Sequence, residues 1–206
     1  KEEINKFEKQ KEALDNLSDE IGITHEDVKG EVVVEEKISK PVTFVQPVIT
    51  EEKKVHLNLG CGYRKIGEPD WINIDSRDLE SNPDMVLDIV KGLPFDDNSI
   101  DTVLANDFLE HIMPQNVISV IEDIYRVLKP NGKFESLTPS TDGRGWAMDP
   151  MHRSFWNANS WLYYTDPDYR GLYGIKAHFK GTVNTFYTNK QLNIVHDHAI
   201  MFAVKE

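Results

Sequence analysis

The sequence predicts an α/β fold with a mostly parallel sheet and an antiparallel hairpin at its C-terminal end. Over residues 55–138, short apolar segments that end at a glycine or an acid alternate with loops and one helical stretch. Such alternation is typical of parallel sheets with connecting helices. Two long strand-like segments, 177–188 and 192–205, then follow one another with no helix between them. They indicate an antiparallel pair at one edge of the sheet.

Each predicted element follows from a local pattern of apolar residues. Residues 114–128 are expected to be helical, because Val120, Ile121 and Ile124 recur at the spacing of one buried helix face. The segment 129–132 (KPNG) contains the residues that end helices. A short helix is also expected over 157–164. Strands are expected at 55–59, 71–75, 85–89, 100–106 and 133–138.

The charge and cysteine content exclude several classes of protein. The 206 residues carry a formal net charge of −12, and basic residues cluster only in pairs such as Lys53-Lys54. This balance disfavours nucleic acids and anionic membranes as partners, and no apolar run approaches the length of a membrane span. Cys61 is the only cysteine, so the chain fits a reducing compartment. We therefore expect a cytoplasmic protein.

Residues 1–50 are predicted to form an N-terminal helical arm and an extended linker, and residues 51–206 a separate domain. Apolar residues in 1–29 recur roughly at helical spacing between charges. Residues 31–50 contain two prolines and β-branched runs, which indicate an extended linker. Such an arm could join two chains in a homodimer or bind another partner, or it could be a solvated helix that lies on the domain.

Polar residues follow several of the predicted strands, at the edge where open α/β sheets bind ligands. The first strand runs into Gly60-Cys61-Gly62, where glycines let the backbone approach a ligand closely. Asp75 ends the second strand and can accept hydrogen bonds from both ribose hydroxyls. Asp88 follows the third and can accept one from the adenine amine, while Asn106-Asp107 ends the fourth. The pattern predicts a cofactor that contains adenosine.

The segment after the glycine turn argues against a dinucleotide cofactor. The dinucleotide fingerprint needs a third glycine and a helix N-terminus beneath the pyrophosphate, but the third position is Lys65. Only eight residues separate Gly62 from Trp71, and Pro69 is one of them, which is too few for a helix with its turns. A cofactor without phosphates needs no such helix, and S-adenosylmethionine is one.

Six motifs of the chain, in this order, resemble those of class I, type 11-like methyltransferases over about residues 55–138. They are HLNLGCG (56–62), ID (74–75), DI (88–89), LPFDDNSID (93–101), FLEHI (108–112) and YRVLKPNG (125–132). No single motif is distinctive, but their order makes the match specific. The resemblance implies a Rossmann-like, seven-stranded sheet whose last strand is inserted antiparallel. It also implies an enzyme that transfers a methyl group from S-adenosyl-L-methionine.

The resemblance further implies a role for each residue of the cofactor site. Gly60 and Gly62 would border the methionine part, Asp75 the ribose, and Asp88 and Ile89 the adenine. Asn106, Asp107 and Phe108 would lie on the sulfonium side, and the predicted site also includes Asn58, Cys61 and Ser76. The chain departs from the family pattern between Gly62 and Trp71. There the usual first helix is shortened or lost, as in a subset of predicted methyltransferases.

Two histidines are candidates for a general base that removes the acceptor proton. His111 lies one helical turn beyond Asp107, and a neutral imidazole can take a proton near neutral pH. His152 lies in the segment 149–156 (DPMHRSFW), where acceptor-binding loops would be, and the resembling family has a similar Asp-Pro-x-His stretch. Either histidine could instead pack against a turn or cap a helix. The aromatic residues of 146–164 could form core or a wall for a sugar or planar acceptor.

His196 and His198 would lie on one face of a strand, but the sequence offers no third ligand near them, so we expect no metal site. The sequence thus predicts a methyltransferase that acts on a small-molecule or glycan-like acceptor. The alternative is a non-catalytic S-adenosylmethionine-binding module, or a subunit that activates a partner. An acceptor cavity bounded by Asn106, His111 and His152 would favour the enzyme.

Overall fold

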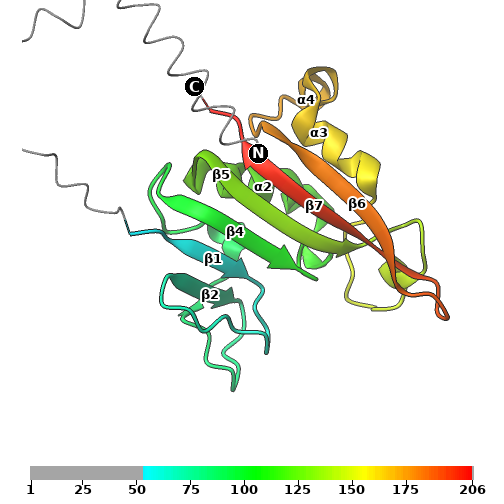
Figure 1. Cartoon of the computed structure of the whole chain (residues 1–206), viewed down its shortest axis with the longest axis horizontal. Helices are drawn as coiled ribbons and strands as arrows, with labels where there is room; N and C mark the ends of the chain where they lie inside the picture. Colours follow the sequence, from blue (N-terminus) through cyan, green and yellow to red (C-terminus); the bar gives the residue numbers. More distant parts are fainter. Residues whose placement is uncertain (1–52, 206) are drawn as a thin grey trace, which may run out of the picture. The chain divides into compact units, whose positions relative to one another are not determined.

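The computed structural model describes residues 53–205, so the arm and linker predicted over residues 1–50 lie outside the described residues. A seven-stranded sheet has the order β3-β2-β1-β4-β5-β7-β6 (Figure 1). Its strands are β1 (His56–Leu59), β2 (Trp71–Asp75), β3 (Met85–Val86), β4 (Ile100–Asn106), β5 (Leu128–Pro139), β6 (Phe179–Asn189) and β7 (Ile194–Ala203). β1 to β5 pair in parallel, whereas β7 pairs antiparallel with both β5 and β6. The predicted Rossmann-like sheet and its C-terminal hairpin are confirmed.

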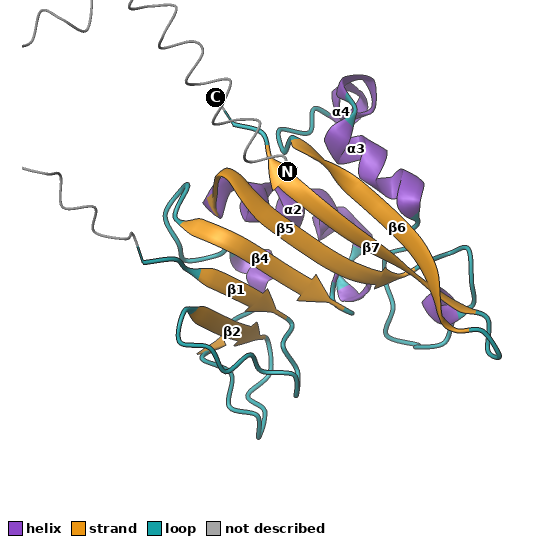
Figure 2. Ribbon diagram, in the orientation of Figure 1, coloured by secondary structure: helices purple, strands orange, loops and turns teal. Residues whose placement is uncertain are grey.

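The helices pack on one face of this sheet. They are α2 (Pro114–Val127), α3 (Leu162–Thr165) and α4 (Pro167–Tyr173), with 3-10 turns η1 (Ile89–Lys91), η2 (Leu109–His111), η3 (Gly145–Ala147) and η4 (Ala158–Trp161). The buried face of α2 carries Val120, Ile121 and Ile124, as predicted. Trp161 of η4 packs against Phe134 of β5, with ring centroids 5.7 Å apart. Figure 2 shows α2 behind β5 and β4, and α3 beside β6. Between residues 53 and 205, no helix has the length and apolar character needed to cross a membrane.

Three elements differ from the sequence-based prediction. The third strand stops at Val86, and the Asp88 carboxylate instead caps η1 by accepting from the backbone N–H of Val90. β5 starts directly after α2. Its pairing with β4 shifts register across residues 129–132, since Leu128 pairs with Ile100 and Lys133 pairs with Thr102. The helix α4 was not predicted, although Asp166 caps it and Pro167 begins it, which are ordinary helix-start signals.

The connection between β1 and β2 contains no helix, which confirms the predicted loss. Asn73 on β2 is fully buried and holds this loop in place. Its Oδ1 accepts from the backbone N–H of Ile66 and from the side chain of Asn58, at 2.7 and 2.9 Å. Its Nδ2 donates to the carbonyl of Ile66 and to Asp84, at 2.9 and 2.7 Å. Side-chain amides therefore hold this loop in place, whereas other folds of this kind have a helix here.

Candidate active site

A crevice lies at the carboxyl ends of β1, β2 and β4, where the sequence placed the cofactor. It consists of two adjoining cavities of about 200 and about 470 Å³. Both cavities are lined by the residues Gly60, Asp75, Ser76, Phe108 and His111. Five of the predicted site residues thus come together around one space, although they belong to separate segments of the chain.

The glycine turn after β1 is shaped for close approach. Gly60 and Gly62 adopt φ of +62° and +50°, a region that favours glycine. A Cβ on Gly60 would lie 2.3 Å from Cδ2 of Phe108, so the Phe108 ring packs directly on this glycine. Gly62 does not line either cavity but donates its backbone N–H to Asp75, at 2.9 Å. The turn therefore forms part of the cavity wall at Gly60 and holds the Asp75 carboxylate in place through Gly62.

Asp75 is the buried carboxylate of the crevice, with 4% of its surface exposed. Its Oδ2 accepts from Gly62, and its Oδ1 accepts from the backbone N–H and the Nε of Arg77, at 3.0 and 3.1 Å. Burial alone would raise the pKa of Asp75, but the hydrogen bonds from Arg77 and Gly62 outweigh burial and lower the pKa. The group is therefore an anion that can accept hydrogen bonds from a ribose.

The smaller cavity has a largely apolar wall and one carboxylate from η1's N-terminal end. Ile89 lies in its wall with Leu87 and Val90, and Asp88 lies at its edge. Asp88 is exposed, and its Oδ1 accepts from the backbone N–H of Val90 at 3.2 Å. Apolar walls with one carboxylate suit a planar base that carries an exocyclic amine.

Asp107 lines the larger cavity and is held by the side chains of His196 and Arg64. Its Oδ1 lies 3.4 Å from Nε2 of His196, and its Oδ2 lies 3.1 Å from Nη1 of Arg64. The hydrogen bond with His196 is the main cause that lowers the pKa of Asp107, against the effect of burial. Asp107 is therefore an anion, and its ion pair with Arg64 connects the loop after β1 to the end of β4.

Other residues of the predicted cofactor site do not line either cavity. Asn58 donates to the carbonyl of Arg64 and to Asn73, so it supports the loop. Cys61 is buried, and its burial raises the pKa of its thiol, which makes it a poor nucleophile. Asn106 ends β4 without lining the crevice. For these three residues, direct contact with a cofactor stays a prediction.

The two candidate bases lie side by side although 41 positions separate them in the sequence. The rings of His111 and His152 meet edge to face, with centroids 5.0 Å apart. His111 lines both cavities, whereas His152 lies behind it and contacts the Trp146 carbonyl through Nδ1, at 2.9 Å. A carbonyl only accepts, so Nδ1 carries the proton and Nε2 has a lone pair whenever the ring is neutral.

The histidines of β7 are paired with carboxylates. His196 contacts Asp107, and Nε2 of His198 lies 2.8 Å from Oε1 of Glu135. They share a sheet face, as predicted, but each has its own acidic partner.

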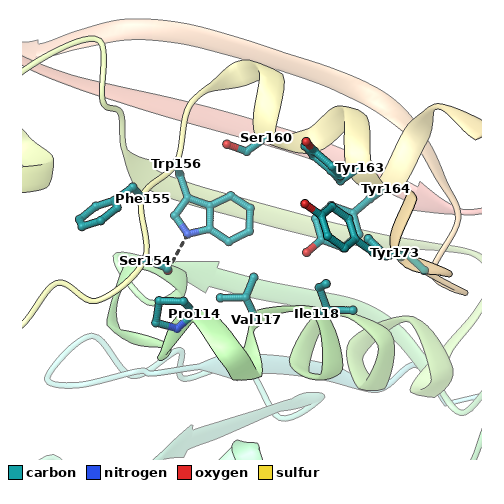
Figure 3. Close-up of a pocket in the computed structure, with 11 residues that line it drawn as sticks. Pro114, Val117, Ile118, Ser154, Phe155, Trp156, Ser160, Tyr163, Tyr164 and Tyr173 are labelled. Atoms are coloured by element: carbon teal, nitrogen blue, oxygen red, sulfur yellow. Dashed lines mark hydrogen bonds between the residues drawn. The ribbon is translucent and has the colours of Figure 1, made fainter. Parts of the chain in front are cut away.

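Half of the aromatic residues in 146–164 are buried in the core, and several rings line a groove. Trp156, Trp161 and Tyr164 are buried. Figure 3 shows Phe155 and Tyr163 on one side of a groove of about 460 Å³, opposite Pro114, Val117 and Ile118 of α2. Asn116 of the same helix lines the smaller cavity of the crevice. The first turns of α2 therefore contribute to both spaces, but neither candidate base lines the groove.

Sequence reasoning missed four residues of this region. Arg77, Asp149 and Met151 line the larger cavity. Glu110 lies beside His111 and is buried, with 2% of its surface exposed. The position of Arg77 two residues after Asp75 is a usable signal, because a side chain there can return to the carboxylate. The burial of Glu110 has no local signal in the sequence.

Residues 69–135 match the family model described as methyltransferase domain. No curated protein sequence matches the chain. A SAM dependent methyltransferase from Archaeoglobus fulgidus aligns with a TM-score of 0.55 and 15% identity, over 73% of this chain and 86% of that one.

Two further solved structures are similar. The methyltransferase in a Haloferax volcanii complex with the activator Trm112 gives a TM-score of 0.52 and 15% identity, over 77% of this chain and 85% of that one. The [4+2]-cyclase SpnF gives 0.53 and 15%, over 76% and 77%. At these identities the likeness concerns the fold.

The described domain therefore has the fold of these methyltransferases, and its segment 69–135 matches the methyltransferase-domain model.

Proposed function

We propose that this chain transfers the methyl group of S-adenosylmethionine to a small-molecule or glycan-like acceptor. The observation that carries the proposal is the shape of the crevice. Asp88 and Ile89 line only the smaller cavity, Asp149 and Met151 line only the larger one, and His111 lines both. A cofactor end and an acceptor end thus adjoin, as a direct transfer between two bound molecules requires.

The residues of the crevice fit the parts of this cofactor. Ile89 and Asp88 would hold the adenine, and Asp75 would accept from the ribose hydroxyls. The open backbone at Gly60, beneath Phe108, would lie beside the methionine part. When bound, the cofactor supplies an electrophilic methyl group on a positively charged sulfur. The anionic Asp75 and Asp107 suit that charge, because both carboxylates have lowered pKa values.

His111 and His152 would remove the proton from the acceptor. His111 faces the larger cavity, so it can reach an acceptor hydroxyl or amine there. His152 is fixed by the Trp146 carbonyl and lies against His111. A positioned base of this kind typically contributes about 10²–10⁴-fold to the rate.

The net charge and the aromatic groove support the proposed class of acceptor. The net charge of −12 disfavours nucleic acids. Phe155, Tyr163 and Tyr173 present rings at the aromatic groove (Figure 3), and such rings suit the apolar face of a sugar or a planar molecule. These features favour a neutral or cationic small molecule or a glycan.

A non-catalytic cofactor-binding module is the second candidate. One structural neighbour with the same fold is the [4+2]-cyclase SpnF, and another is bound to an activator protein, so the fold by itself does not fix the reaction. The lined space beside His111 favours an enzyme, because a module has no need of an acceptor cavity.

The test is transfer of a deuterated methyl group from S-adenosylmethionine to a panel of hydroxylated small molecules and saccharides. Mass spectrometry would detect both the labelled acceptor and S-adenosylhomocysteine. We expect labelled product only in reactions that contain the full chain. Tight cofactor binding with no transfer to any acceptor class would instead favour the module.

Replacement of the candidate bases gives a sharper test. His111→Asn and His152→Asn should lower kcat by about 10²–10⁴-fold, without changing the affinity for S-adenosylhomocysteine. His178→Asn is the matched control, because His178 lies outside the crevice. Equal loss in all three variants would argue against a specific role.

A further inference from the structure

Three side chains beside the crevice are placed like a metal-binding set. Glu110 and His111 come from η2, and His152 comes from the loop after β5. One ligand atom from each lies within 4.8 Å of the others. Ligand atoms around a first-row divalent ion lie about 3–4 Å apart, given bonds of about 2.0–2.2 Å. Small side-chain rotations would therefore bring these three atoms to one ion.

We propose that Glu110, His111 and His152 bind a divalent transition-metal ion at the edge of the cofactor crevice. Two imidazoles and one carboxylate are a set that holds such ions while leaving coordination positions open. Two of the three residues, His111 and His152, are the ones that the sequence offered only as bases.

The state of Glu110 is the independent observation that points to a ligand. Glu110 is 2% exposed, and neither Oε1 nor Oε2 has a partner with good hydrogen-bond geometry among residues 53–205, although the backbone N–H groups of Glu110 and Phe108 lie near the carboxylate. A buried carboxylate without partners is costly, and such groups are rare unless something satisfies them. A cation or a proton can do so. Asp107 and Asp149 add further negative charge near Glu110, which favours a cation.

His152 is oriented as metal-bound histidines usually are. Its Nδ1 donates to the Trp146 carbonyl, at 2.9 Å, which leaves Nε2 as the ligand atom. An imidazole whose other nitrogen donates to a carbonyl or a carboxylate has a fixed tautomer and ring orientation. The site therefore includes a contact, outside the three ligands, that holds His152 in its orientation.

The backbone holds the two segments of the site together. The N–H groups of Arg153 and Ser154 both donate to the carbonyl of Glu110, at 2.7 and 3.0 Å. The Ser154 hydroxyl donates to the carbonyl of Leu109, at 2.8 Å. The loop after β5 is thus fastened to η2 next to the three side chains, so little ordering is needed when an ion binds.

The ion would bind the acceptor oxygen, and this use rests on the proposed function. His111 lines the larger cavity, so open coordination positions would face it. A bound cation lowers the pKa of a coordinated hydroxyl, and the proton leaves to water in the crevice. The oxygen then bonds to the methyl carbon, the bond from that carbon to sulfur breaks, and its electron pair stays on sulfur. His111 and His152 act as ligands in this scheme.

The test is a titration of the full chain, without a polyhistidine tag and after treatment with a chelator, with Co²⁺. Visible absorption reports coordination of the ion, and calorimetry with Zn²⁺ gives the stoichiometry. We expect one ion per chain. Glu110→Gln and His152→Asn should each weaken binding at least about tenfold, whereas His178→Asn should leave it unchanged. Gln resembles a protonated carboxyl group in shape, so Glu110→Gln is expected to fold.

Two outcomes separate this proposal from the methyltransferase proposal. If both ligand variants bind Co²⁺ as tightly as the natural chain, or if the natural chain binds none, the metal site is wrong whatever the activity. If the ion binds at this site but no methyl transfer occurs, the metal site stands and the proposed function fails. Circular dichroism of each variant checks that a loss of binding does not come from unfolding.

Discussion

Glu110 is a buried carboxyl group, and neither of its oxygens has a partner with good hydrogen-bond geometry among the described residues. Burial raises the pKa of Glu110 from 4.5 to about 8. Between these values the unfolded chain loses this proton and the folded chain keeps it, so stability falls as pH rises. The slope is up to about 1.4 kcal/mol per pH unit.

Urea unfolding in the presence of a chelator, from about pH 5 to about pH 8, measures this effect. Glu110→Gln removes the titrating group, so the variant should gain stability relative to the natural chain as pH rises. Parallel stability curves for the two proteins would contradict the raised pKa.

Gly60 has a backbone conformation and a neighbour that exclude a side chain. Gly60→Ala would put a Cβ 2.3 Å from the Phe108 ring at φ +62°. We expect a loss of about 1–3 kcal/mol in stability from strain, and weaker cofactor binding because Phe108 must move. Gly67→Ala is the control, since a Cβ there meets nothing within 4 Å. Thermal unfolding and binding of S-adenosylhomocysteine measure both effects, and equal behaviour of the two variants would count against this account.

At the scale of elements, the loop between β1 and β2 depends on buried amides. Asn73→Ala would remove the partner of the Ile66 backbone N–H and carbonyl, and one of the two hydrogen bonds that the Asn58 amide donates. We expect a loss of about 2–4 kcal/mol in the free energy of unfolding, together with weaker cofactor binding. Asn184→Ala on the exposed part of β6 is the control. Denaturant titration would detect the difference, and a loss of less than about 1 kcal/mol at Asn73 would contradict the role given to it.

The elements that could be predicted from the sequence are those with local signals. The strands around Leu57 and Ile74 are short, these two residues are fully buried, and α2 has a regular buried face. The missing first helix followed from the eight residues between Gly62 and Trp71. The early end of β3 could not be predicted, because whether Asp88 continues a strand or caps a turn depends on its surroundings.

The site was predictable in part, for the same reason. Asp75 and Phe108 follow strands, so the edge of the sheet brings them together. The cluster of Glu110, His111 and His152 depends on how the loop after β5 folds back onto η2. No spacing in the sequence encodes that contact, and Glu110 beside a histidine resembles an ordinary surface acid.

At the scale of the whole described domain, the sheet order accounts for the crevice. β1 lies between β2 and β4, so the turns and acids that follow these strands meet at one edge. Asp107 then links that edge to β7 through His196. Through this contact the C-terminal hairpin supports the crevice, although the hairpin adds no residue to the cofactor end of the crevice.

The most direct test of the central claim is calorimetry of S-adenosylhomocysteine with the full chain and two variants. Asp75→Asn removes the negative charge of the buried acceptor, so affinity should fall by about tenfold or more. Asp78→Asn, at an exposed position three residues on, should bind as the natural chain does. The account predicts one site per chain that is weakened only by Asp75→Asn. Absence of binding to the natural chain, or equal binding by all three proteins, would contradict it.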